Sequence, residues 1–254
     1  MNYDILIYNG KFHTFENPFD FYKSMLIKNG KIVKLYKENY IEDDINLKND
    51  IKDIVDLHGQ IAIPSFISNP VYILPLILFI SNPSESFNDI HKAEKYYQIL
   101  TKEEKEKIIK KAIKYFIYNG ISTVIIKEDK RKYSINNKLT EYIKKHLNIM
   151  FIPEDKNSLC NHKIHNVHQE LYPLNKIKKD IKSGMDSYMA FKKELYLQKR
   201  YMNFNCNIGL IKENYYANFT ILSKNLFLLN KDNVEPIVPI KTFVFGKEMI
   251  KKTN

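Results

Sequence analysis

The chain has 254 residues, of which 44% are hydrophobic and 27% charged, and its formal net charge is +11. This is the composition of a globular protein with a substantial core, so it excludes a disordered chain and a collagen-like repeat. Only Arg131 and Arg200 among the 40 basic residues are arginines, the residues that make bidentate contacts with phosphate and guanine. The charge therefore predicts a solvated lysine coat and no specific nucleic-acid partner, with an anion-binding face as the alternative.

Short strands and turn signals fill residues 1–60. Two Asn-Gly pairs, at 9–10 and 29–30, each stand between two strand-like runs. Because Asn-Gly is typical of a two-residue hairpin, both are predicted to join paired strands. His58-Gly59 predicts a third turn. The strand-like runs are residues 4–8, 11–15, 24–28, 31–35, 55–57 and 60–63.

Residues 61–80 form a mostly apolar run that is long enough to cross a bilayer. However, Pro64, Pro70 and Pro75 interrupt it, and prolines at this spacing are expected to prevent a continuous helix. The run therefore predicts no membrane span. It predicts a buried strand followed by an extended, packed segment.

Helices and strands alternate in the middle of the chain. Thr101 and Glu104 form a capping box at the start of a predicted helix, and Gly120 stands where that helix would end. Strands are predicted at 121–126 and 148–152, with a helix between them, which indicates parallel α/β structure. Two more helices are predicted from apolar residues at helical spacing: Leu174, Ile177 and Ile181 in one, Tyr188, Phe191 and Leu195 in the other.

The last part of the chain returns to strands, at 217–222 and in a hairpin over 240–250. The order β, then α/β, then β predicts an α/β unit inserted into a β unit whose two parts pair in space. We place a composite β domain at residues 1–60 and 207–254, and a truncated α/β domain at 61–206. Cys160 and Cys206 cannot build a disulfide scaffold, and no leader peptide opens the sequence, so a cytoplasmic location is expected.

Six stretches of the sequence carry a resemblance to one family: residues 4–11, 25–33, 55–73, 120–124, 209–222 and 244–247. They are similar to the opening strand, the second hairpin, the first barrel strand, a Gly-hydrophobic-Thr-Thr-Val strand, the return to the β domain and the closing hairpin of the amidohydrolase superfamily. The resemblance implies a small β-sandwich-like domain and a (β/α) barrel. It also implies a metal-dependent hydrolase of non-peptide C–N bonds.

The sequence departs from the family where the first barrel strand ends. The family has Pro-Gly-Phe-Ile-Asp-x-His-x-His there, and its two histidines bind the metal. Here the aligned residues are Ser68 for the aspartate and Pro70 and Tyr72 for the histidines. Proline has no side-chain donor atom, and a tyrosine phenol is a poor ligand for Zn²⁺ near neutral pH. Further on, Asn214 and Asn218 stand for the family's glycine and aspartate.

Length supports the same interpretation. About 135 residues separate Tyr72 from Asn207, whereas a complete (β/α)₈ barrel needs roughly 200 to 250. The α/β unit is therefore expected to be an incomplete remnant of a barrel, inserted into the β domain.

Two groups of residues remain as candidates for chemistry. One is a cluster that Zn²⁺ would suit, although no regular zinc motif has its spacing: Cys160, His162, His165 and His168. The other is a set of acidic residues that follow the two predicted α/β strands, where parallel α/β proteins carry their sites: Glu128, Asp129, Glu154 and Asp155. No cofactor is expected, with a divalent metal at the first cluster as the alternative.

Three functional hypotheses follow. The first is a catalytically inactive amidohydrolase-like protein, whose open strand edges and apolar faces are covered by self-association or by a protein partner. The second is a metal-dependent hydrolase of C–N bonds with a rebuilt metal site at His162, His165 and His168. The third is a basic module that binds an anionic surface.

Overall fold

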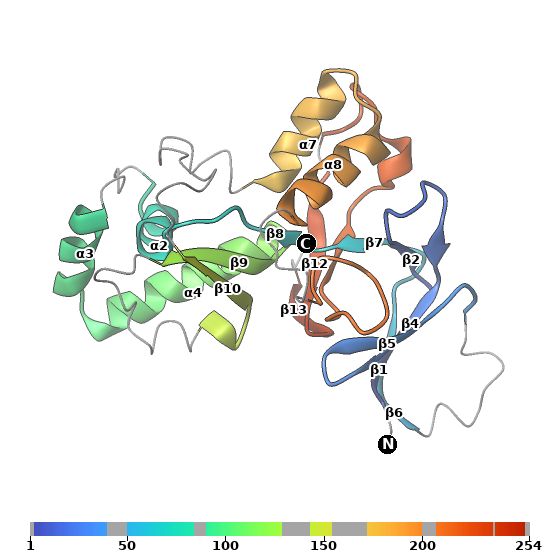
Figure 1. The fold of residues 1–254 in the computed structure, drawn as a ribbon, viewed down its shortest axis with the longest axis horizontal. Coiled ribbons are helices and arrows are strands. Elements are labelled where there is room, and N and C mark those ends of the chain that lie inside the picture. Colours follow the sequence, from blue (N-terminus) through green and yellow to red (C-terminus); the bar gives the residue numbers. More distant parts are fainter. Residues whose placement is uncertain are drawn as a thin grey trace.

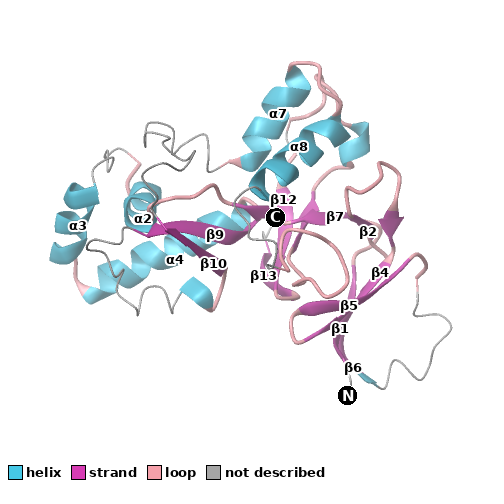
Figure 2. Cartoon of the chain, in the orientation of Figure 1, coloured by secondary structure: helices cyan, strands magenta, loops and turns pink. Residues whose placement is uncertain are grey.

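The structure, a computed structural model, describes residues 3–39, 50–83, 90–128, 143–153, 172–199, 207–235 and 237–251. Within these ranges the chain forms three β-sheets, two of mixed pairing and one parallel, together with five α-helices (Figures 1 and 2).

The first sheet is formed by the N-terminal part of the chain. The hairpin predicted at Asn29-Gly30 is confirmed, because β4 and β5 pair antiparallel on either side of it. Asn29 and Gly30 have φ angles of 51° and 73°, which this tight turn requires. The sheet has the order β5-β4-β1-β6, from strands β1 (Tyr3–Tyr8), β4 (Ser24–Lys28), β5 (Lys31–Tyr36) and β6 (Ile51–Asp56).

The hairpin predicted at Asn9-Gly10 is wrong. β1 pairs with β4 and β6, whereas the next strand, β2 (Lys11–His13), pairs with β3 (Phe21–Tyr22) and β7 (Ile61–Pro64) in another sheet. Asn9 does adopt a turn conformation, with a φ of 52°. The turn carries the chain from one sheet to the next, so that side chains of both strands enter the same apolar core.

Strands from both ends of the chain share a six-stranded sheet of order β13-β12-β11-β7-β2-β3. Its centre is the antiparallel pairing of β7 with β11 (Phe219–Leu222). The predicted C-terminal hairpin is confirmed as β12 (Pro239–Val244) and β13 (Lys247–Lys251). Buried aromatic side chains hold the two parts together: the rings of Phe12 on β2 and Phe219 on β11 meet edge to face, with centroids 5.7 Å apart.

The third sheet is small and parallel. Its order is β10-β9-β8, from β8 (Phe66–Ile67), β9 (Ile121–Glu128) and β10 (Asn148–Pro153). Helix α4 (Lys102–Tyr118) packs on β9, and its predicted capping box is confirmed. The backbone N–H of Glu104 donates to Thr101 Oγ1 over 3.2 Å, and the N–H of Thr101 donates to Glu104 Oε2 over 2.7 Å.

The extended segment predicted after the first barrel-like strand is wrong. Residues Ile73–Ser81 form helix α2, and Pro75 is its third residue. The first turn of a helix makes no use of its backbone N–H groups, so a proline there costs no hydrogen bond. Helix α3 (Ile90–Ile99), which follows, was not among the predicted elements. A search of the described residues found no helix long and apolar enough to cross a membrane.

Helices α7 (Pro173–Lys182) and α8 (Ser187–Lys199) are confirmed and pack as a pair. In Figure 1 they lie beside the six-stranded sheet, away from α2 and α3. The short 3₁₀ helix η2 (Leu226–Leu228) contacts α8. One large buried cluster includes side chains from α2, α4, β9, α7 and α8, so both sets of helices contribute to one core.

Candidate functional site

The resemblance places the family's metal site at the end of β8. After β8 the chain continues beside β9: the N–H of Ser68 donates to Thr123 O, and the N–H of Val71 donates to Ile125 O, each over 2.9 Å. Val71 also forms a parallel bridge with Ile126. The segment that would carry metal ligands is therefore held along a neighbouring strand by backbone hydrogen bonds.

Ser68, at the position of the family's aspartate, is 1% exposed and fully engaged with the backbone. Its Oγ accepts a hydrogen bond from the N–H of Ile125 and donates one to Asn69 O, each over 2.9 Å. A short hydroxyl here completes the pairing of two strands. Ser68 therefore stabilises the sheet, because both hydrogen bonds of its hydroxyl are made with backbone groups.

Pro70 and Tyr72 occupy the positions of the two histidines. Pro70 is buried and offers no donor atom for a metal. Tyr72 is half-buried and is the N-cap residue of α2, with the apolar residues of that helix directly after it. The donor set at this strand end does not fit a catalytic metal ion, because neither nitrogen ligand of the family is present.

The candidate zinc cluster, Cys160, His162, His165 and His168, lies outside the described residues, as do Asp129, Glu154 and Asp155. Glu128 is the last residue of β9, and only its backbone is described. All of them therefore remain candidates predicted from the sequence. A search confined to the described residues found no group of three or more His, Cys, Asp or Glu that could hold a metal ion.

Three buried hydroxyl groups lie where β8 and β9 begin, and they were not predicted as a group. The hydroxyls of Ser65 and Ser122 are hydrogen-bonded to each other, and Ser122 Oγ lies 3.4 Å from Thr123 Oγ1. All three residues are at most 1% exposed. Because no described carboxylate or imidazole is hydrogen-bonded to them, they satisfy one another and do not form an activated nucleophile.

Asn214 and Asn218, which stand at the positions of a glycine and an aspartate of the family, also have structural roles. Asn214 has a φ of 70°, which asparagine tolerates better than most residues. Asn218 is 1% exposed, and its Oδ1 accepts a hydrogen bond from the N–H of Phe245 over 2.8 Å. Its backbone oxygen accepts one from the N–H of Ser65 over 3.2 Å. Asn218 thus ties the closing hairpin to the start of the small parallel sheet.

His13 is the titratable side chain whose environment the sequence did not reveal. It is 3% exposed and lies between the rings of Phe21 and Phe227, with centroids 5.5 and 4.6 Å away. Burial lowers the pKa of His13 to about 4, with a smaller lowering from Lys11 and an opposing effect from Asp20. The imidazole is therefore neutral at neutral pH and acts as a packed ring.

Comparison with known proteins gives results only at the level of structure. No protein-family model matches the sequence, and no curated protein gives a significant match. Guanine deaminase from E. coli matches with a TM-score of 0.59 and 11% identity, covering 98% of this chain and 99% of its own. β-Aspartyl dipeptidase from Fervidobacterium islandicum AW-1, in complex with β-Asp-Leu dipeptide, matches with a TM-score of 0.57 and 10% identity, covering 97% and 96%.

A molinate hydrolase structure is matched over 59% of this chain with 16% identity and a TM-score of 0.40, and the chain spans only 30% of its length. At these identities the likeness concerns the fold alone. The structures matched are amidohydrolase-superfamily proteins, and the family resemblance expected from the sequence is thereby confirmed in the fold of the chain.

Proposed function

We propose that this chain is an amidohydrolase-like protein that lacks the family's metal-dependent hydrolysis and acts by association, with a second copy or with a protein partner. The observation that carries the proposal is the end of β8, where Pro70 and Tyr72 replace metal ligands and the Ser68 hydroxyl is bonded to the backbone. Without that site, water cannot be activated as in the family.

The division of the chain belongs to this proposal. A sandwich-like β domain would comprise residues 1–60 and 207–254 and would also take in β7, which pairs with β2 and β11. The rest of residues 61–206 would form the barrel remnant. Two features support it. The six-stranded sheet combines strands from both chain ends, and the part of the chain that the structure describes has three parallel barrel-type strands where a complete barrel has eight.

Metal content tests the loss of chemistry. Untagged protein would be purified, dialysed and analysed for Zn, Mn and Ni, with circular dichroism to confirm that it is folded. We expect far less than one metal ion per folded chain. Roughly one ion or more per chain would contradict the proposal and favour the rebuilt site at Cys160 to His168. Substituting His165 and His168 by alanine should then abolish metal binding, whereas binding that survives would exclude that site.

A basic face on α4 supports a second candidate function, binding to a polyanion. Its opposite face is buried in the core, which fixes the orientation of the helix. The exposed residues that form it, spaced i, i+3, i+4 and i+7, are Lys107, Lys110, Lys111 and Lys114. Lys111 donates to Ser81 O over 2.9 Å, and no described carboxylate pairs with the other three. Such a row offers about four phosphate contacts without sequence preference.

Charge-matched variants separate this candidate from the effect of overall charge. One variant replaces the four α4 lysines by glutamine, and the control replaces four exposed lysines of the β-rich part: Lys34, Lys212, Lys231 and Lys247. Binding to mixed-sequence duplex DNA should have a logarithmic salt slope of about −3 to −4, and only the α4 variant should lose it. Equal losses in both variants would identify a non-specific lysine coat.

A further inference from the structure

Five aromatic rings are stacked in a continuous column where α8, η2 and the loop after β2 meet. From the core outward they are Phe191, Phe15, Tyr188, Phe227 and Phe19. Successive centroids lie 6.5, 5.3, 6.0 and 6.1 Å apart, and successive rings are inclined by 25°, 14°, 17° and 28°. These are the distances of interacting aromatic pairs. The innermost ring is fully buried, and the outermost, Phe19, is 85% exposed.

The inner part of the column is fixed. Phe15 has a φ of 63°, a left-handed conformation that a bulky residue adopts only when its surroundings impose it. Tyr188 Oη donates a hydrogen bond to Phe15 O over 3.1 Å, which ties the loop to α8. The loop that carries Phe19 is therefore fixed at its base. When a partner covers the Phe19 ring, this loop would lose little conformational freedom.

A second apolar side chain is exposed on η2, the element whose Phe227 ring stacks on Phe19. Leu228, which follows Phe227 in the chain, is 70% exposed. We call the two exposed side chains, Phe19 and Leu228, the Phe19 patch. Exposed aromatic anchors beside apolar neighbours are typical of the centre of a protein interface.

The charges around the patch favour a second copy of the chain as the occupant. Asp20, next to Phe19, is paired with Lys37, Glu16 is exposed on the same loop, and Lys192 Nζ lies 5.5 Å from the Tyr188 ring. Charges of both signs thus lie on the loop that carries Phe19 and on the elements that pack beside it. Elsewhere this chain of net charge +11 carries exposed lysines that would repel another copy. In an isologous contact at the Phe19 patch, Glu16 and Asp20 of one copy can lie opposite Lys37 and Lys192 of the other.

We propose that two copies of the chain associate through the Phe19 patch, in an isologous contact that buries both Phe19 rings. The inference rests on the proposed function, which assigns the chain to association, and it names the surface.

The test is sedimentation velocity of the full chain over a range of concentrations. The wild-type chain should form a dimer. A variant with Phe19→Ser and Leu228→Ser should dissociate with a Kd raised at least about thirty-fold, the effect of removing an interface hot spot. Ile99→Ser is the matched control, because Ile99 is 78% exposed on α3, in the other part of the molecule. Its dimer should be unchanged.

The outcomes separate this inference from the proposed function. A monomeric wild-type chain at all concentrations would overturn the self-contact. A dimer that the double variant leaves intact, or that Ile99→Ser weakens equally, would overturn the patch and leave association standing. Bound metal in the elemental analysis would overturn the proposed function, whatever the result for the patch.

Discussion

The six-stranded sheet and the small parallel sheet follow one another along the chain, since β7 ends at Pro64 and β8 begins at Phe66. They use polar groups differently. In the six-stranded sheet, the buried hydroxyls of Thr220 and Thr242 donate to the backbone outside the sheet, at the end of α4. Facing side chains in the first are stacked aromatic rings, such as Phe219 and Phe243. In the second sheet, buried hydroxyls form hydrogen bonds with one another or with the backbone, at Ser65, Ser68 and Ser122. At the end of β8, where the family resemblance predicts a metal site, this chain has hydrogen bonds that hold the segment after β8 against β9.

The largest expected effect tests whether the two sheets unfold together. Phe219→Ala in the first region and Phe116→Ala on α4 each truncate a fully buried ring, and each should lower the free energy of unfolding by about 3 to 5 kcal/mol. Since one buried cluster includes Ile63 of β7 and Val124 of β9, we expect a single urea transition in both variants. Two transitions, with each substitution shifting only one of them, would show that the sheets are independent.

A pH effect of about 2 to 3 kcal/mol is expected from His13, in the six-stranded sheet. The folded chain binds the proton less well than the unfolded chain, because burial lowers the pKa of His13 to about 4 from an ordinary value of 6.5. Stability is therefore complete above pH 6.5 and falls as the pH drops from 6.5 to 4. The free energy of unfolding of His13→Phe, measured by urea titration at a series of pH values, should lack this part of the pH dependence.

The buried Phe12, next to His13 in β2, provides the control for that experiment. Phe12→Leu removes buried apolar volume but no titratable group, so it should lower stability by about the same amount at every pH and leave the acid dependence unchanged. If His13→Phe and the wild-type chain lose stability in parallel between pH 6.5 and 4, the imidazole is not the group that titrates.

Local signals in the sequence predicted the elements well where neighbours in sequence are neighbours in space. The turn at Asn29-Gly30 and the capping box at Thr101 are examples, because each is complete within a few residues. The hairpin at Asn9-Gly10 failed since a turn does not specify which strands pair across it. The helix at 73–81 differs from the prediction because a proline inside an apolar run indicates a helix break, whereas Pro75 lies in the first turn, where it costs no hydrogen bond.

The candidate site shows the same limit. That Pro70 and Tyr72 carry no nitrogen donor for a metal follows from the sequence itself, because it depends only on which residues are present. The hydrogen bond that the Ile125 N–H donates to Ser68, and the burial of His13 against Phe227, join residues far apart in sequence. Such contacts depend on the assembled sheets, and no local pattern indicates them.

A smaller effect is expected at the strand end itself. Ser68→Ala would remove the acceptor of the Ile125 N–H and leave that buried donor unpaired, at a cost of about 1 to 3 kcal/mol in unfolding free energy. Ser223→Ala is a control, since Ser223 Oγ also accepts a backbone N–H, from Val238 over 3.0 Å, but in an exposed position where water can replace it. Equal costs in the two variants would mean that the Ser68 bond has no special part in holding the small sheet.

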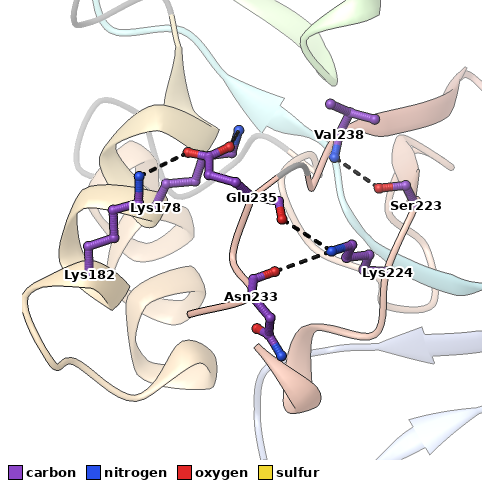
Figure 3. A network of polar contacts seen from close by, with 7 residues as sticks. All are labelled: Lys178, Lys182, Ser223, Lys224, Asn233, Glu235 and Val238. Carbon is purple, nitrogen blue, oxygen red and sulfur yellow. Dashed lines mark hydrogen bonds and ion pairs between the residues drawn. The ribbon is translucent and has the colours of Figure 1, made fainter. Parts of the chain in front are cut away.

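The smallest effect is expected where α7 meets the loop before β12 (Figure 3). Glu235 accepts from Lys178 over 2.7 Å and from Lys182 over 3.4 Å, while Lys224 Nζ donates to the backbone oxygens of Asn233 and Glu235, each over 3.2 Å. The hydrogen bond from Lys178 lowers the pKa of the Glu235 carboxyl, so its contribution to stability is present at neutral pH and is lost as the pH falls through the carboxyl range.

Because the Glu235 side chain is 49% exposed, Glu235→Gln should cost no more than about 1 kcal/mol, and less in high salt. Lys178→Gln should have most of this effect and Lys182→Gln little of it, since the first ammonium is nearer and its side chain is only 15% exposed. A loss from Glu235→Gln as large as that from Ser68→Ala would reverse the expected order. It would mean that this half-exposed ion pair fixes α7 to the sheet as firmly as the buried hydroxyl joins β8 to β9.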